Sequence, residues 1–142
     1  MIAYYDTSAL LKLFLKEEHS DALRAHAAQI KTAVVSELTW VEMHSALGRR
    51  VRLGKSAEEI TLAALDAFKN KWQDYVVVSP SFNIIQSASE HAQVIGLRAF
   101  DAVQLASARQ AERAIHDDFI FCTFDKQLNT AARVLGMQVL DL

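Results

Sequence analysis

Four acidic residues occupy positions from which they could hold a metal ion together. Two follow short apolar segments and two lie within helical patterns: Asp6 after IAYY, Asp125 after FIFCTF, Glu42 in LTWVEMHSAL and Asp101 in LRAFDAVQLASA. Carboxylate oxygens are the ligands that Mg²⁺ and Mn²⁺ prefer in proteins. If the four side chains point into one cleft, they predict a cation site and the phosphoryl chemistry that such ions support.

Asp6 and Asp125 each have a second interpretation, because an aspartate that directly precedes a helix commonly caps it. The segment DTSAL suits a cap at Asp6, and Thr123 could share the capping role with Asp125. Taken singly, neither residue decides between a cap and a metal ligand. The prediction of a site therefore depends on the two helical acids.

Glu42 and Asp101 lie on helical stripes whose other members are apolar. Leu38 lies four residues before Glu42 and Ala46 four residues after it, which places this carboxylate beside the core rather than on a polar face. Asp101 has an alternative role as a first-turn aspartate favoured by the helix dipole. That role explains its position along the helix but not its alignment with an apolar stripe formed by Leu97, Leu105 and Ala108.

Four inward-facing carboxylates require positive charge, because burying each one is costly and clustering them adds repulsion. Lys12, Lys16 and Lys126 are too few and too loosely placed to neutralise all four. The five histidines show no pair at a spacing typical of zinc sites. Oxygen-only ligation therefore predicts Mg²⁺ or Mn²⁺ as the cofactor.

The elements that must position these acids alternate between strands and helices. Apolar runs predict strands at 2–5, 33–35, 76–78, 119–123 and 138–140, and helical patterns fall at about 8–15, 20–30, 37–52, 56–72, 82–95, 101–114 and 126–135. Such alternation indicates a mostly parallel sheet with helices on both faces. Ligands of these folds bind beyond the carboxyl ends of the strands, where Asp6 and Asp125 are expected to lie.

Composition indicates a single domain over residues 1–142. The chain is 51% hydrophobic, with one Pro, four Gly and no linker or repeat. Its start lacks the features of a secretory signal, and no run approaches the ~20 apolar residues of a membrane span. The single cysteine, Cys122, agrees with a cytoplasmic location. We therefore expect a cytoplasmic protein without a membrane segment.

The net charge of −2 gives no global attraction to nucleic acid, so a polyanionic substrate would need a local basic patch or bound cations. One such patch is the segment GRRVRLGK, which contributes Arg49, Arg50, Arg52 and Lys55 as candidate RNA-binding residues. Its alternative role is a solvated helix end, where cations complement the helix dipole.

The four acidic segments together resemble the PIN-domain family, and within it the VapC-type ribonuclease toxins of toxin–antitoxin pairs. The matching segments are YYDTSALLKLFLKEE, SELTWVEMHSALGRR, LRAFDAVQLASARQA and FCTFDKQLNTAARVLGMQVL. The resemblance implies a three-layer α/β/α fold around a five-stranded, mostly parallel sheet. It also implies cleavage of single-stranded RNA with Mg²⁺ or Mn²⁺, a homodimer and a cognate antitoxin protein.

The family pattern identifies Asp6, Glu42, Asp101 and Asp125 as the catalytic acids. We expect Asp6 and Asp101 to bind the metal directly, and Glu42 and Asp125 to act through water or on a second ion. Thr7, Ser8 and Thr123 are expected to support these ligands or to serve as local caps. Gln104 stands where relatives often carry His or Leu, and we expect it to contact substrate or partner.

Three other functional classes remain as alternatives. A phosphatase of the haloacid-dehalogenase type would need a second acid where this chain has Ser8, and a receiver domain would open with an acidic pair. A non-catalytic module whose acidic cleft binds a basic peptide is the main alternative. A helix side carrying Trp40, Leu47 and Val51 is a candidate surface for self-association or, in the simpler view, part of the core.

Overall fold

Strands and helices alternate along the chain in the computed structural model, which describes residues 1–142. The elements are β1 (Ile2–Tyr5), α1 (Thr7–Phe14), α2 (Ser20–Ala27), β2 (Thr32–Ser36), α3 (Leu38–Arg52), α4 (Glu58–Lys71), a 3₁₀ turn (Trp72–Asp74), β3 (Val76–Val78), α5 (Phe82–Ile95), α6 (Ala99–Ala114), β4 (Phe119–Cys122) and α7 (Lys126–Val134). All the helices predicted from the sequence are present, with ends that differ by a few residues. None of them combines the length and apolar character needed to cross a membrane.

The sheet has four strands in the order β3-β2-β1-β4, and every neighbouring pair is parallel. The expectation of a fifth strand at 138–140 is wrong in this structure. That segment forms one isolated parallel bridge, between Val139 and Phe121, held by two backbone hydrogen bonds. Since the ladder stops after this one residue pair, the segment lies beside β4 without forming a strand.

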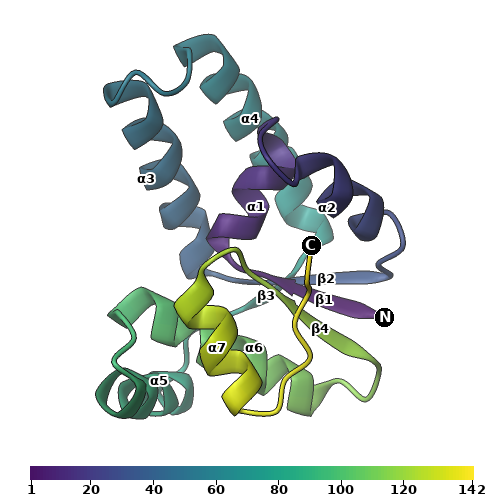
Figure 1. Ribbon diagram of the computed structural model, residues 1–142, viewed down its shortest axis with the longest axis vertical. Helices are drawn as coiled ribbons and strands as arrows, with labels where there is room; N and C mark the ends of the chain where they lie inside the picture. Colours follow the sequence, from purple (N-terminus) through teal and green to yellow (C-terminus); the bar gives the residue numbers. More distant parts are fainter.

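Two hydrophobic cores lie on opposite faces of the sheet, so the fold has three layers (Figure 1). Side chains alternate along a strand, and β1 supplies both cores. Ile2 and Tyr4 pack in the core that also contains residues of α5, α6 and α7, whereas Ala3 and Tyr5 pack in the core with residues of α1 to α4. Burial on both faces explains why β1 is apolar throughout, as is typical of parallel sheets.

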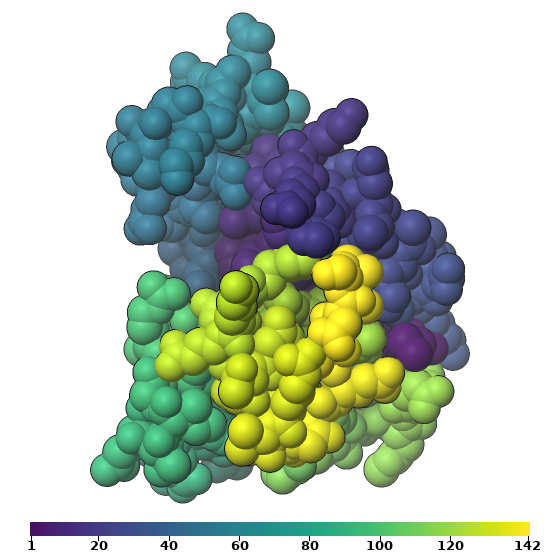
Figure 2. Space-filling view, viewed as in Figure 1, coloured from purple at the N-terminus to yellow at the C-terminus, as the bar shows by residue number.

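Helices α3 and α4 form an arm that projects from the sheet (Figure 1). Its base is held by aromatic packing, in which Trp40 contacts Trp72 and Phe68 with ring centroids 5.1 and 5.7 Å apart. Leu47 is buried in the core. Of the residues considered for self-association, Leu47 therefore packs within the chain, whereas Trp40 contacts these rings and remains 38% exposed. A hollow separates the arm from the C-terminal half of the molecule in the space-filling view (Figure 2).

The order of the strands reverses between β1 and β4, because β2 and β3 follow on one side of β1 and β4 lies on the other. The backbone N–H of Asp6 donates to the carbonyl of Cys122, at 3.1 Å, so the ends of these two strands are directly joined. Asp6 and Asp125 thus leave the sheet at the edge where open parallel sheets bind ligands.

Candidate active site

Asp6 is both a helix cap and a buried acid at the end of β1. Its Oδ1 accepts hydrogen bonds from the backbone N–H of Ala9, at 2.9 Å, and from Ser8 Oγ, at 2.7 Å. Its Oδ2 accepts one from Thr123 Oγ1. Only 4% of the residue is exposed. A carboxylate offers about four acceptor positions, so the three donors leave one for a further ligand.

Asp125 caps α7 through its Oδ1, which accepts from the backbone N–H of Leu128 at 2.9 Å. Its own N–H donates to Thr123 Oγ1 at 3.1 Å. Thr123 therefore connects two of the acids, since it also donates to Asp6. The capping role of Asp6 and Asp125 is confirmed, and it leaves room for a ligand because a capping carboxylate engages only part of its acceptor capacity.

Glu42 extends from α3 and is oriented by two donors. Thr7 Oγ1 donates to Glu42 Oε1 at 3.0 Å, and Gln104 Nε2 donates to the same oxygen at 2.6 Å. Gln104 is 1% exposed. The expectation that it contacts substrate or partner is therefore wrong, because it lies beneath the cleft and acts on Glu42.

A buried hydrogen-bond network holds Gln104 in place. Its Oε1 accepts from the Tyr4 hydroxyl at 2.6 Å, and its Nε2 also lies 3.1 Å from Thr39 Oγ1. Tyr4 is completely buried on β1, and burial raises the pKa of its hydroxyl. The network therefore fixes a side chain of α6 to the sheet through Tyr4 and to α3 through Thr39 and Glu42.

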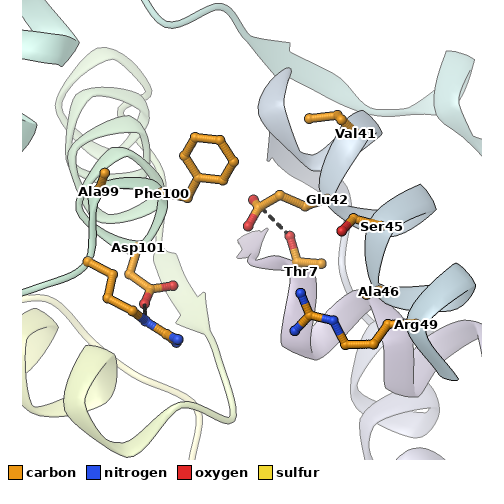
Figure 3. Close-up of a pocket in the computed structure, with 10 residues that line it drawn as sticks. Thr7, Val41, Glu42, Ser45, Ala46, Arg49, Ala99, Phe100 and Asp101 are labelled. Atoms are coloured by element: carbon orange, nitrogen blue, oxygen red, sulfur yellow. Dashed lines mark hydrogen bonds and ion pairs between the residues drawn. The ribbon is translucent and has the colours of Figure 1, made fainter. Parts of the chain in front are cut away.

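Asp101 faces Glu42 across a cleft between α6 and α3 (Figure 3). The cleft has a volume of about 510 Å³ and is lined by Thr7, Val41, Glu42, Ser45, Ala46, Arg49, Arg98, Ala99, Phe100 and Asp101. Asp101 Oδ2 accepts from Arg98 Nε at 3.2 Å, and Arg98 Nη2 lies 3.9 Å from Asp125 Oδ2. Arg98 thus contacts two of the four acids from the rim of the cleft.

Burial, and to a smaller extent a neighbouring carboxylate, raises the pKa of two of the acids, Asp6 and Glu42. Burial raises the pKa of Asp6 from 3.8 to about 6, against the lowering effect of its hydrogen bonds, and the charge of Glu42 raises it further. Burial likewise raises the pKa of Glu42, Gln104 and Thr7 lower it, and Asp101 raises it. Repulsion therefore runs from Asp6 through Glu42 to Asp101, and bound positive charge would relieve it.

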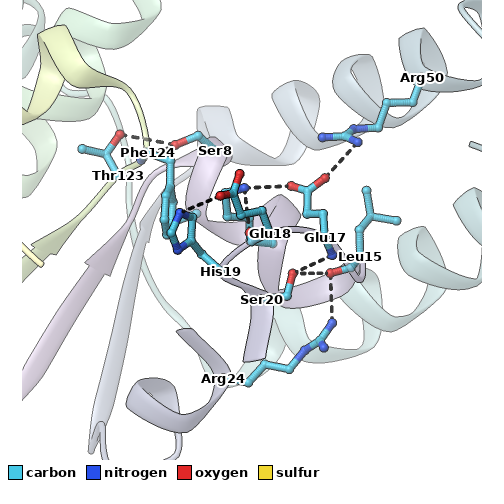
Figure 4. Close-up of polar contacts among 12 residues, drawn as sticks. Ser8, Leu15, Glu17, Glu18, His19, Ser20, Arg24, Arg50, Thr123 and Phe124 are labelled. Atoms are coloured by element: carbon cyan, nitrogen blue, oxygen red, sulfur yellow. Dashed lines mark hydrogen bonds and ion pairs between the residues drawn. The ribbon is translucent and has the colours of Figure 1, made fainter. Parts of the chain in front are cut away.

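The four predicted RNA-binding cations are not placed alike. Arg49, on α3, lines the cleft (Figure 3), and so does Arg98, the residue directly before α6. Arg50 instead pairs with Glu17, with Nη1 3.0 Å from Oε2 (Figure 4). The remaining two, Arg52 and Lys55, are exposed at the far end of α3 and in the turn after it.

Lys12 directs its charge away from the four acids. Its Nζ lies 3.4 Å from Glu17 Oε1, 3.0 Å from the carbonyl of Glu18 and 4.9 Å from the centre of the Phe124 ring. The backbone N–H of Phe124 donates to Ser8 Oγ at 2.9 Å. This hydrogen bond orients the Ser8 hydroxyl next to Thr123 (Figure 4). The acids are thus surrounded by neutral donors, and Arg98 is the cation that pairs with them.

The PIN domain family model matches residues 3–134, a range that contains all four acids. The chain belongs to the PIN domain family. Among its relatives is ribonuclease VapC46 of Mycobacterium tuberculosis, which is 31% identical over 137 residues that cover 96% of this chain and 95% of the relative.

Solved structures share the fold of this PIN domain. A toxin–antitoxin complex from Klebsiella pneumoniae contains a chain with a TM-score of 0.65 and 18% identity, covering 98% of this chain and 96% of that one. VapC20 of Mycobacterium tuberculosis, described as a toxin that cleaves the sarcin–ricin loop, has a TM-score of 0.67 and 19% identity, covering 91% and 94%. At these identities the likeness concerns the fold.

The oxygen ligands of this PIN domain are of the type that a hard divalent cation prefers, but they do not lie close together. All four acids supply oxygen, and three of them repel one another. No three of the acidic, histidine or cysteine side chains, however, stand close enough to enclose an ion. An ion bound here would therefore need water to complete its coordination or the carboxylates to move closer together.

Sequence reasoning missed two residues of this site. Arg98 precedes Asp101 by three residues, the spacing at which charged helical side chains meet, and that signal could have revealed the pair. Tyr4 carried no such signal, because only the folded structure shows that its hydroxyl meets Gln104.

Proposed function

We propose that this PIN domain is a metal-dependent endoribonuclease that cleaves single-stranded RNA. One observation carries the proposal: a buried acid, Asp6, and two acids that face each other across a cleft, Glu42 and Asp101, repel one another at the ligand-binding edge of a parallel sheet. Keeping such charges together without nearby lysines is costly unless the site binds cations. The ribonuclease activity named for relatives such as VapC46 supports the same conclusion.

The proposed cofactor is Mg²⁺ or Mn²⁺, with Asp6 and Asp101 as direct ligands. Glu42 and Asp125 act through water or on a second ion. Such an ion, when bound, lowers the pKa of a coordinated water and stabilises charge on the phosphoryl and leaving oxygens. Within the chain, Ser8 and Thr123 orient Asp6.

Glu42 has its own pair of orienting donors, Thr7 and Gln104. Burial raises the pKa of Glu42, and the hydrogen bonds from Gln104 and Thr7 oppose that rise, so they favour the ionised form that a metal ligand requires. Arg49 and Arg98 stand on opposite walls of the cleft and are the residues proposed to hold RNA phosphates.

We further propose that the protein acts as a toxin of the VapC type, as one domain over residues 1–142. Relatives carry the VapC name, and similar chains occur in toxin–antitoxin complexes. A cognate antitoxin protein, a homodimer and a cytoplasmic location are part of this proposal. Expression in a bacterial host should arrest growth, and co-expression of the antitoxin should restore it.

The test is cleavage of a mixed pool of single-stranded RNA by the purified protein, with Mg²⁺, with Mn²⁺ and with EDTA. Cleavage with either ion and none in EDTA is the expected result. A double-stranded RNA of the same composition serves as the matched control and should resist cleavage. A protein that binds the pool equally well with or without metal, and never cleaves it, would instead be a binding module with an acidic cleft.

A further inference from the structure

An exposed apolar side chain stands directly before each of the two facing acids. Val41 precedes Glu42 on α3 and is 54% exposed, and Phe100 precedes Asp101 on α6 and is 52% exposed. Both line the cleft, and the ring of Phe100 extends into the space between the helices (Figure 3). Neighbouring residues on a helix are about 100° apart, so each apolar side chain lies beside its carboxylate on the same wall.

Core packing does not explain these two side chains. Neither Val41 nor Phe100 is buried in either hydrophobic core, although the Phe100 side chain also borders an apolar pocket formed with Ala88 and Val103. The residues of α6 that follow, from Ala102 to Ala108, are buried. The helix therefore leaves an aromatic ring half exposed at the turn that borders the acids, where a ligand bound in the cleft would cover it.

The charges around the ring specify the chemistry of that ligand. Arg49 and Arg98 line the same cleft from opposite walls, so the walls combine cations with apolar surface. A nucleotide matches both features, with a phosphate for the guanidinium groups and a flat base for the ring. The volume of about 510 Å³ falls within the range of small-ligand sites.

We propose that Phe100 and Val41 form a nucleobase subsite, in which a base adjoining the scissile phosphate stacks on the Phe100 ring. The inference rests on the proposed ribonuclease function and adds the recognition of one unstacked base. A base in a duplex is already covered on both faces, so the subsite selects single-stranded RNA. Stacking on an aromatic ring tolerates any base, so the subsite sets strandedness and position rather than sequence.

The experiment uses a short RNA with one mapped cleavage site, and the same RNA with a single abasic nucleotide at each position around that site. Phe100→Ala is compared with Phe100→Tyr, which keeps a ring. Phe82→Ala is the matched control, because Phe82 is an exposed phenylalanine at the start of α5 that does not line the cleft. KM and kcat are measured for each pair of protein and RNA.

Phe100→Ala is expected to raise KM about tenfold with little change in kcat, while Phe100→Tyr and Phe82→Ala behave as the wild type. One abasic position should raise KM of the wild type by a similar factor and leave that of Phe100→Ala unchanged. Such non-additivity assigns that base to this ring. The subsite would be overturned if Phe100→Ala and Phe82→Ala had the same KM. It would also be overturned if, at every abasic position, the effects of Phe100→Ala and of the missing base on KM simply multiplied.

Equilibrium binding of the same RNAs in EDTA, followed by fluorescence anisotropy, separates this inference from the proposed function. If the wild type never cleaves RNA but Phe100→Ala binds RNA more weakly than the wild type does, the ribonuclease is disproved and the subsite is kept. Light scattering of Phe100→Ala completes the test. A change in the number of subunits with unchanged RNA binding would reject the subsite and make the ring a contact between copies of the chain.

Discussion

Gln104 Nε2 donates a 2.6 Å hydrogen bond to Glu42 Oε1 and so joins α6 to α3 beneath the cleft. The amide is neutral at every pH, whereas a histidine at this position would change charge near neutrality. The other polar atom of the amide, Gln104 Oε1, accepts a hydrogen bond from the Tyr4 hydroxyl. Gln104 is therefore a positioning residue, which holds the Glu42 carboxylate in one orientation and favours its ionised form.

Gln104→Met removes the donor to Glu42 while keeping most of the side-chain volume. We expect cleavage or metal affinity to fall about 10- to 100-fold, the usual cost of losing a residue that orients a ligand. Gln110→Met, on the exposed face of the same helix, is the control. A loss of thermal stability without a change in metal affinity would reduce Gln104 to a structural role.

Gln104→Glu tests the electrostatic part of the same relationship. The new carboxylate still accepts from Tyr4 but places a like charge next to Glu42, which raises the pKa of Glu42 further. The acidic limb of the pH–rate profile should therefore move to higher pH. An unchanged profile would show that Gln104 does not govern the ionisation of Glu42.

The raised pKa of Asp6 predicts how the metal-free protein responds to pH. Because the pKa is about 6 in the folded protein against 3.8 ordinarily, the folded state binds this proton more tightly than the unfolded state does. The free energy of unfolding should therefore decrease as pH rises from about 4 to about 6 and remain low above that. Asp6→Asn removes the charge and should raise the free energy of unfolding at pH 7.5 by up to about 3 kcal/mol.

Urea unfolding in EDTA at pH 7.5 and at pH 4.5 measures this effect. The gain from Asp6→Asn should shrink at pH 4.5, where Asp6 of the folded wild type is mostly protonated. Asp66→Asn, an exposed change on α4, should alter stability little at either pH. Destabilisation by Asp6→Asn at both values would mean that its hydrogen bonds matter more than its buried charge.

Arg98 neutralises Asp101 and Asp125 in the metal-free protein and so competes with a cation. Exposed ion pairs contribute about 0.2–1 kcal/mol, so Arg98→Ala should tighten Mn²⁺ binding by up to about fivefold in titration calorimetry. RNA binding should weaken, because the cleft loses a guanidinium group. Arg133→Ala, which breaks an ion pair on α7, is the control. Weaker Mn²⁺ binding by Arg98→Ala would contradict competition.

Arg49 and Arg50 are adjacent in sequence but differ in surroundings, and this makes them a matched pair. Arg49 lines the cleft, whereas Arg50 is held by Glu17. Arg49→Ala should lower RNA affinity and reduce the slope of log K against log salt by about 0.7, the share of one phosphate contact to a single strand. Arg50→Ala should do neither, and equal effects would place the RNA elsewhere on α3.

Local patterns were sufficient to predict the parallel architecture. Period-two and period-3.6 signals act within one element, so the four strands, seven helices and the strand ends beside Asp6 and Asp125 were predictable. The absence of a fifth strand at 138–140 was not predictable, because it depends on how far the pairing with β4 extends beyond Val139. An apolar run of three residues carries no information on that length.

Contacts between distant segments were the part of the site that sequence could not supply. Tyr4 and Gln104 are one hundred residues apart, and their hydrogen bond exists only because α6 packs across the sheet. The same holds for Arg50, whose partner Glu17 comes from the segment after α1. A basic run therefore predicts charge on a helix but not which of its cations is free for RNA.

The most direct test is cleavage of a defined single-stranded RNA by the wild type and by Asp101→Asn, prepared identically and compared with Mn²⁺, with EDTA and with Mn²⁺ restored after EDTA. Matching circular dichroism spectra would establish that the variant is folded. We predict cleavage by the wild type only with metal, its return on restoring Mn²⁺, and its loss in Asp101→Asn together with weakened Mn²⁺ binding. Full activity of Asp101→Asn, or wild-type cleavage that persists in EDTA, would contradict a metal-dependent ribonuclease at this cleft.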